Sequence, residues 1–189
     1  MSSSSAARAT SGTGISTWII DPVHSSVEFS VKHMMIATVK GQFSQVEGLI
    51  RFDPASHETA EVDAKIDTTS VTTFNEGRDN HLRTNDFFNA EAFRYITFTS
   101  SSVEKAGADR YKVHGDLTIR DVTKPVVLDT EFDGQIVDAY GQDRAAFTAT
   151  TEINRRDFGV NWNAALESGG VVVSDKVKIT LHIAAVRQE

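Results

Sequence analysis

The segment KVHGDLTIR, residues 112–120, decides the fold class of this chain. Its apolar residues Val113, Leu117 and Ile119 alternate with polar or charged ones, and Gly115 takes the remaining position of the apolar phase. Side chains of a β-strand point alternately to opposite faces, so this period of two predicts a strand with one dry and one wet face. Further strand patterns lie on both sides of this segment. They are Trp18 to Asp21, Ser26 to Lys32, Val39 to Asp53, Val62 to Asp67, Tyr95 to Phe98, Thr123 to Val137, Ala145 to Ile153 and Val177 to Ala185.

The connections between these strands point to a single all-β domain. Most of them are short and turn-like, and no helical crossovers separate successive strands, which argues against a parallel α/β sheet. We therefore predict an eight-stranded antiparallel β-barrel. A barrel of this size either packs its own side chains or holds one small ligand, and the period alone does not choose between the two. Gly41 and Gly48 lie inside a predicted strand and indicate the bends that a closing barrel needs.

One stretch, residues 73–98, interrupts the strand pattern with TFNEGRDNHLRTNDFFNAEAFRYITF. Thr73 and Glu76 have the spacing of a capping box, which predicts a short helix that runs to about Arg83. A second, shorter helix is expected over residues 85–88, capped by its own first polar residues. Neither helix is long enough to be stable alone, so both must pack on the barrel. We interpret the stretch as a lid at one end of it.

Composition and charge exclude several partners. The formal net charge is −7 and no basic block occurs, so we expect neither nucleic acid nor an anionic membrane as a partner. There is no cysteine, which rules out disulfides and thiolate metal sites. Residues 1–17 are small and polar and are expected to form a disordered tail, followed by one domain over 18–187. No signal peptide or membrane span is recognisable, so we expect a cytoplasmic protein without stable membrane insertion.

No residue set indicates catalysis or a metal site. A nucleophile elbow of the form G-x-S-x-G is missing, and no histidine pair has the helical spacing of a zinc site. His57, His114 and His182 fall at turns or on wet faces and are expected to be solvated. A structural role is predicted for His24, His33 and His81, as hydrogen-bond donors to loop carbonyls at the mouth of the barrel. We therefore expect no enzyme activity, no metal and no cofactor other than a bound lipid.

Several blocks in fixed order resemble the YceI-like family. The resemblance extends from Thr17 to Arg187, which is nearly the whole predicted domain. Ordered blocks of this length are far more specific than one short motif. The blocks are DPVHS at 21–25, the following FSVKH, VKGQF at 39–43, HLRTNDFF at 81–88, YITF at 95–98, GDLTIRDVTKPVVL at 115–128 and NRRDFGV at 154–160.

The resemblance implies a lipocalin-like barrel that binds, stores or transports a polyisoprenoid or a similar long-chain amphiphile, such as an isoprenoid quinone or its precursor. Many relatives are periplasmic, and this chain differs from them in its lack of a signal peptide. The alternatives are an enzyme acting on a buried lipid or quinone and a packed barrel that works through protein partners. A homodimer through exposed strand edges is possible.

Candidate ligand-binding residues follow from the inward phase of the predicted strands and from the lid. Phe87 and Phe88 are expected to close the lid, Trp162 to stand at the rim, and His33 or Arg83 to contact a polar head. The inward-facing candidates are Phe29, Val31, Phe43, Ile50, Phe52, Phe98, Leu117, Ile119, Phe132, Phe147, Phe158 and Leu181.

Overall fold

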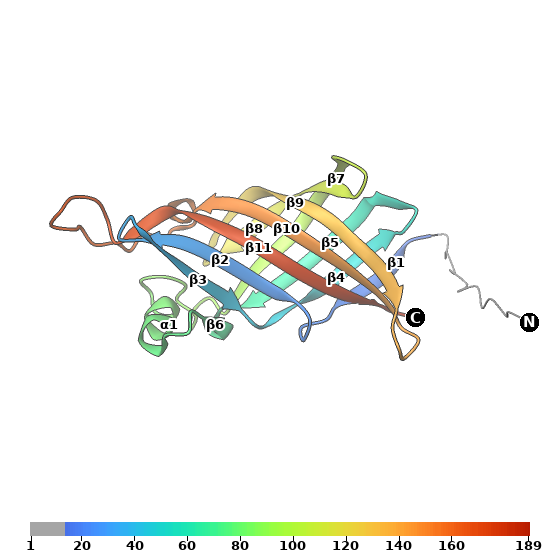
Figure 1. The fold of residues 1–189 in the computed structure, drawn as a ribbon, viewed down its shortest axis with the longest axis horizontal. Coiled ribbons are helices and arrows are strands. Elements are labelled where there is room, and N and C mark those ends of the chain that lie inside the picture. Colours follow the sequence, from blue (N-terminus) through green and yellow to red (C-terminus); the bar gives the residue numbers. More distant parts are fainter. Residues whose placement is uncertain (1–13) are drawn as a thin grey trace, which may run out of the picture.

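The computed structural model describes residues 14–189, which form a closed antiparallel β-barrel with one α-helix packed at one end (Figure 1). The predicted tail falls mainly on residues 1–13, which lie outside the described residues. The strands are β1 (Ser16–Ile20), β2 (Ser26–His33), β3 (Ala37–Phe43), β4 (Val46–Asp53), β5 (Ser56–Asp67), β6 (Val71–Thr72), β7 (Tyr95–Lys105), β8 (Arg110–Ile119), β9 (Val122–Val137), β10 (Asp143–Asn154) and β11 (Val173–Arg187). The helix α1 spans Glu76–Arg83, and two 3₁₀ turns, η1 and η2, span Thr68–Ser70 and Arg155–Phe158.

These segments make eight barrel strands because three of the eight are each interrupted once. β1 and β2 form the first interrupted strand, and both pair with β11. β4 and β3 form the second, in which β4 pairs with β1 and β3 with β2. β5 and β6 form the third, in which β5 pairs with β4 and β6 with β3. The ring closes where β1 meets β11, with Trp18 opposite Arg187. The prediction of an eight-stranded antiparallel barrel is confirmed.

Inward-facing residues follow the period that the sequence showed. In β8, Val113, Leu117 and Ile119 are all buried. The predicted strand over residues 39–53 is broken at residues 44–45 into β3 and β4, so Gly41 and Gly48 each lie inside a strand. At Gly41 a Cβ atom would collide with the Phe29 ring from the paired position, so the glycine leaves room for an interior aromatic side chain.

The lid differs from its prediction at the N-terminus of the helix. Asn75, not Thr73, caps α1, and its Oδ1 accepts a hydrogen bond from the Arg78 amide at 2.9 Å. Thr73 instead donates its amide and hydroxyl to the buried carboxylate of Asp79, so the expected capping box is wrong. Residues 85–88 form turns and not the expected second helix. The cap differs from its prediction because the buried carboxylate of Asp79 accepts the hydrogen bonds of Thr73 at the start of the helix.

The lid covers an opening in the barrel wall. The β5–β7 ladder ends at the pair Asp67 and Tyr95, and β6 beyond it pairs with β3 alone. Residues 73–94 connect β6 to β7, and their side chains Leu82, Phe87 and Phe88 line the barrel interior. Figure 1 shows α1 beside β3 and β6, at the end that also holds the β2–β3 turn and the long β10–β11 loop. We call this the lid end; the far end carries the β4–β5, β7–β8 and β9–β10 turns.

No helix within residues 14–189 is long and apolar enough to cross a membrane.

Asp21 holds the far end together at the break between β1 and β2. Its carboxylate accepts hydrogen bonds from the Val23 amide, from His24 Nδ1 at 2.7 Å and from Arg144 at 2.9 Å. Arg144 also donates to Asp138 in the β9–β10 turn. Burial would raise the pKa of Asp21, but the hydrogen bonds from His24, Arg144 and Val23 outweigh it and lower that pKa from 3.8 to about 2.

Replacing Asp21 with asparagine should lower stability in a pH-dependent way. A depressed carboxyl pKa stabilises the fold above the unfolded value of 3.8, and this contribution disappears as the pH falls through about 2. We expect Asp21→Asn to unfold at a lower temperature than the parent at pH 6, with the two midpoints converging toward pH 2. Thermal unfolding followed by circular dichroism across this range is the measurement. A difference independent of pH would contradict the ionic contribution.

Candidate ligand-binding site

The barrel interior contains two apolar cavities that lie one after the other along its length. The lid-side cavity has a volume of about 140 Å³ and is bounded by Leu82, Phe87 and Phe88 of the lid segment. The far cavity has a volume of about 130 Å³ and extends to Tyr111 near the far end. Cavities of this size, when lined by apolar side chains, stay dry and hold a molecule about as large as benzene. The interior is therefore incompletely packed.

Three aliphatic side chains separate the two cavities. Val27, Ile66 and Leu181 line both of them and come from β2, β5 and β11. We call these three residues the waist. An extended hydrocarbon longer than one cavity must displace the waist side chains to occupy both.

Most of the sequence-predicted residues line these cavities. Those on the lid-side cavity are Phe29, Val31, Phe43, Phe87, Phe88, Ile119 and Leu181, and those on the far cavity are Ile50, Phe52, Phe98, Phe147 and again Leu181. Periodicity found the strand residues among them because inward-facing positions of a closed barrel converge on its axis, and Phe87 and Phe88 come from the lid.

Four predicted residues lie elsewhere. Leu117 and Phe158 belong to the packed core, and Phe132 packs against His57 and Phe147. Arg83 donates its guanidinium hydrogens to the backbone carbonyls of Thr69 and Val71 and to the Asn80 side chain. That side chain holds the lid to the barrel.

A third cavity of about 160 Å³ adjoins the lid-side cavity and opens between the tips of β2 and β3, α1 and Trp162. We call it the mouth cavity. His33 and Trp162 both line it, as expected of rim residues, and Lys32 and Arg78 add positive charge. Trp162 packs 4.9 Å from the His81 ring and 5.4 Å from Phe87, measured between ring centres. The mouth therefore combines an aromatic wall with cationic groups.

Two of the three histidines assigned a structural role bond to carboxylates and not to carbonyls. His24 pairs with Asp21 and His81 with Asp86, at 2.7 and 2.8 Å. Within residues 14–189 there is no cluster of three or more histidine, aspartate or glutamate side chains that could hold a metal ion.

The expectation that His57 is solvated is wrong. The pairing of β4 with β5 shifts register, from Arg51 opposite Glu61 to Asp53 opposite Ser56. The extra residues in β5 turn the His57 side chain inward, where it lines the far cavity. Sequence analysis also missed Tyr111, which lines the same cavity from β8. The position of Tyr111 two residues before buried Val113 could have predicted that it faces inward. The register shift that turns His57 inward leaves no such pattern in the sequence.

Arg155 is a buried cation in the wall of the lid-side cavity, only 5% exposed. It donates to the backbone carbonyls of Val160, Trp162, Val173 and Ser174 at 2.8–3.1 Å, and thereby ties η2 to both sides of the β10–β11 loop. Burial lowers the pKa of its guanidinium, a change that neighbouring Arg156 reinforces and Asp175 opposes. Its donors are directed at the backbone, so its role here is structural.

Comparison with known proteins identifies related chains. The family model described as YceI-like domain matches residues 18–185. The UPF0312 protein SAS2572 of Staphylococcus aureus (strain MSSA476) is 39% identical over 165 residues, covering 87% of this chain and 94% of that protein. The Campylobacter jejuni YceI protein is 35% identical, with a TM-score of 0.71 over 84% of this chain and 90% of that chain.

Two more distant structures show the same fold. Burkholderia cenocepacia BcnA is 24% identical, with a TM-score of 0.77 over 87% of this chain and 98% of its own. A polyisoprenoid binding domain from Saccharophagus degradans, implicated in plant cell wall breakdown, is 15% identical, with a TM-score of 0.66 over 93% of this chain and all of its own.

Proposed function

This chain belongs to the YceI-like family, and from that premise we propose that it binds a polyisoprenoid or a similar long-chain amphiphile inside the barrel, for storage or transport. The observation that carries the proposal is the pair of apolar cavities aligned along the barrel and divided by the waist. The polyisoprenoid binding domain of Saccharophagus degradans, which has the same fold, adds support.

The energetics favour a long apolar chain over a compact ligand. Each methylene removed from water contributes roughly 0.8 kcal/mol before the costs of binding are subtracted. A chain that runs through the waist gains this contribution in both cavities. An isoprenoid quinone or its precursor has such a chain and an oxygen-bearing head, and we propose this class as the ligand.

The direct test is native mass spectrometry of the purified full chain, followed by lipid extraction. A co-purified prenyl lipid, released unchanged, is the expected result. Turnover of that lipid during incubation would indicate an enzyme instead. A clean apo mass, with no uptake of added prenyl lipid, would contradict binding and favour a packed barrel that serves protein partners.

A further prediction concerns anionic heads. If a prenyl phosphate places its phosphate in the mouth cavity, His33→Ala should weaken its binding by a few fold, while binding of the hydrocarbon without a head group stays the same. The reason is the loss of a charge-assisted hydrogen bond beside Lys32 and Arg78. Competition binding with both probes measures the ratio, and His182→Ala on the outer face of β11 is the matched control. Equal losses for both probes would count against a head at the mouth.

A further inference from the structure

His57 has a buried polar atom with no partner. Its Nδ1 is shielded from solvent and forms no hydrogen bond with any group of residues 14–189. The rings of Phe52, Tyr111 and Phe132 surround the imidazole, with centre-to-centre distances of 5.3, 5.3 and 4.6 Å. Buried polar atoms are nearly always paired, so each exception needs an explanation.

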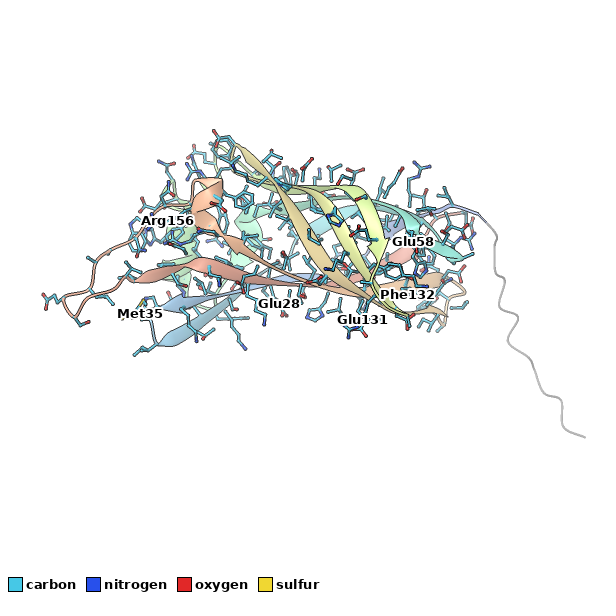
Figure 2. All side chains as sticks on the ribbon, turned by 90° about the horizontal axis from the view of Figure 1, so that it is seen from above. Glu28, Met35, Glu58, Glu131, Phe132 and Arg156 are labelled. Carbon is cyan, nitrogen blue, oxygen red and sulfur yellow. The ribbon has the colours of Figure 1, made fainter. Side chains whose placement is uncertain are left out.

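The far cavity adjoins this imidazole. His57 lines that cavity together with Tyr111 and Thr130, which are its other polar residues, and apolar side chains make up the rest. Figure 2 places the neighbouring Glu58 and Phe132 at the far end, opposite Met35 and Arg156 at the lid end. The polar groups therefore lie at the end of the cavity row that is farthest from the mouth.

The electrostatics around His57 favour a neutral head group. Burial lowers the pKa of His57, and although Asp109 and Asp53 oppose this change and Lys105 supports it, the net direction is downward. The imidazole is then neutral at pH 7, and its Nδ1 either donates to a carbonyl or accepts from a hydroxyl. Burial raises the pKa of Tyr111, and the carboxylates of Asp109 and Glu58 raise it further. Carboxylates around this end disfavour a phosphate.

We propose that the His57 imidazole, with its covered Nδ1 turned toward the ligand, binds the oxygen of a neutral lipid head, either a hydroxyl or a carbonyl, in the far cavity. The chain of such a lipid runs from His57 past the waist toward α1. This inference rests on the proposed function and adds the orientation of the ligand and the class of its head group. Lipids with anionic heads bind in the reverse orientation, with the head at the mouth.

The test compares three probes that share one prenyl chain: geranylgeraniol, geranylgeranyl phosphate and the hydrocarbon that lacks the oxygen. Each is titrated into the full chain and into His57→Leu, His57→Asn and His182→Leu. The parent should bind the alcohol about tenfold more tightly than the hydrocarbon, a ratio worth about 1.4 kcal/mol. His57→Leu should abolish this preference, measured as the ratio of the alcohol and hydrocarbon affinities within the same variant. His57→Asn should restore part of it, because its side-chain amide takes the place of Nδ1.

The outcomes separate this inference from the function on which it rests. An alcohol preference that survives in His57→Leu, or one that His182→Leu also removes, overturns the role of His57 and leaves lipid binding intact. Absence of binding by the parent to all three probes overturns both. Thermal unfolding of each variant controls for folding, and we expect His57→Leu to be at least as stable as the parent because it removes an unpartnered polar atom.

Discussion

Arg155→Met should destabilise the protein by about 3–5 kcal/mol, because several carbonyls lose their donor and each buried acceptor left unsatisfied costs about 1–3 kcal/mol. The substitution keeps much of the aliphatic volume but leaves the carbonyls of Val160, Trp162, Val173 and Ser174 without their donor. Of these residues, Val160 and Val173 line the apolar lid-side cavity, and the Val173 carbonyl keeps one other donor, Asn163 Nδ2, at 2.7 Å. Chemical denaturation of the parent and the variant gives the difference in unfolding free energy.

Arg156→Met is the matched control, because Arg156 is the adjacent arginine in the same turn. It is exposed and makes one side-chain bond, to Asp175 at 2.6 Å. Exposed ion pairs of this kind contribute about 0–1 kcal/mol. If both substitutions cost the same, the guanidinium of Arg155 does not hold the β10–β11 loop as described.

Ala149→Phe should remove binding of long prenyl chains while binding of short ones persists. Ala149 is buried on β10 and lines the far cavity, so a phenyl ring fills space that is otherwise empty. A ligand that loses burial of about four methylenes loses roughly 3 kcal/mol, or about two orders of magnitude in affinity. Geranyl phosphate, whose anionic head lies at the mouth and whose short chain stays on the lid side of the waist, should bind as before. Titration of geranylgeraniol and geranyl phosphate into both proteins measures the effect.

The control for this experiment is Ala146→Phe, on the opposite face of the same strand. Ala146 pairs with Ala184, and the preceding Ala145 points into the core. A phenyl ring there adds the same bulk outside the barrel and should leave both affinities unchanged. Unimpaired binding of geranylgeraniol by Ala149→Phe would mean that the chain does not enter the far cavity, and the proposed path through the waist would then be wrong.

The fold was predictable because its signal is local. Alternation in segments such as residues 112–120 assigns each side chain to a face, and the closed barrel confirms that assignment at Val113, Leu117 and Ile119. The lid was predictable only as a short, poorly stable insertion. Its cap moved from Thr73 to Asn75 because the buried Asp79 carboxylate takes the Thr73 hydrogen bonds. That contact depends on burial, which a spacing rule does not contain.

The candidate site divides in the same way. Its apolar lining was found from periodicity, since every inward position of a barrel faces one shared interior. Periodicity could not predict that three residues, Val27, Ile66 and Leu181, divide this interior, because they come from three strands far apart in sequence. In the sequence, Arg155 stood out only as a member of the block NRRDFGV. Its four backbone contacts exist because the chain returns to it after a long loop.

The amino-acid sequence was enough to establish which side chains of each strand face inward, that the chain forms a β-barrel, and that the barrel interior is apolar. These properties follow from the period of two along the chain. Tertiary structure alone decided that the interior is hollow and that His57 turns into it. Both depend on how strands register against one another: a shift between β4 and β5 reverses the direction of a side chain without changing a single residue.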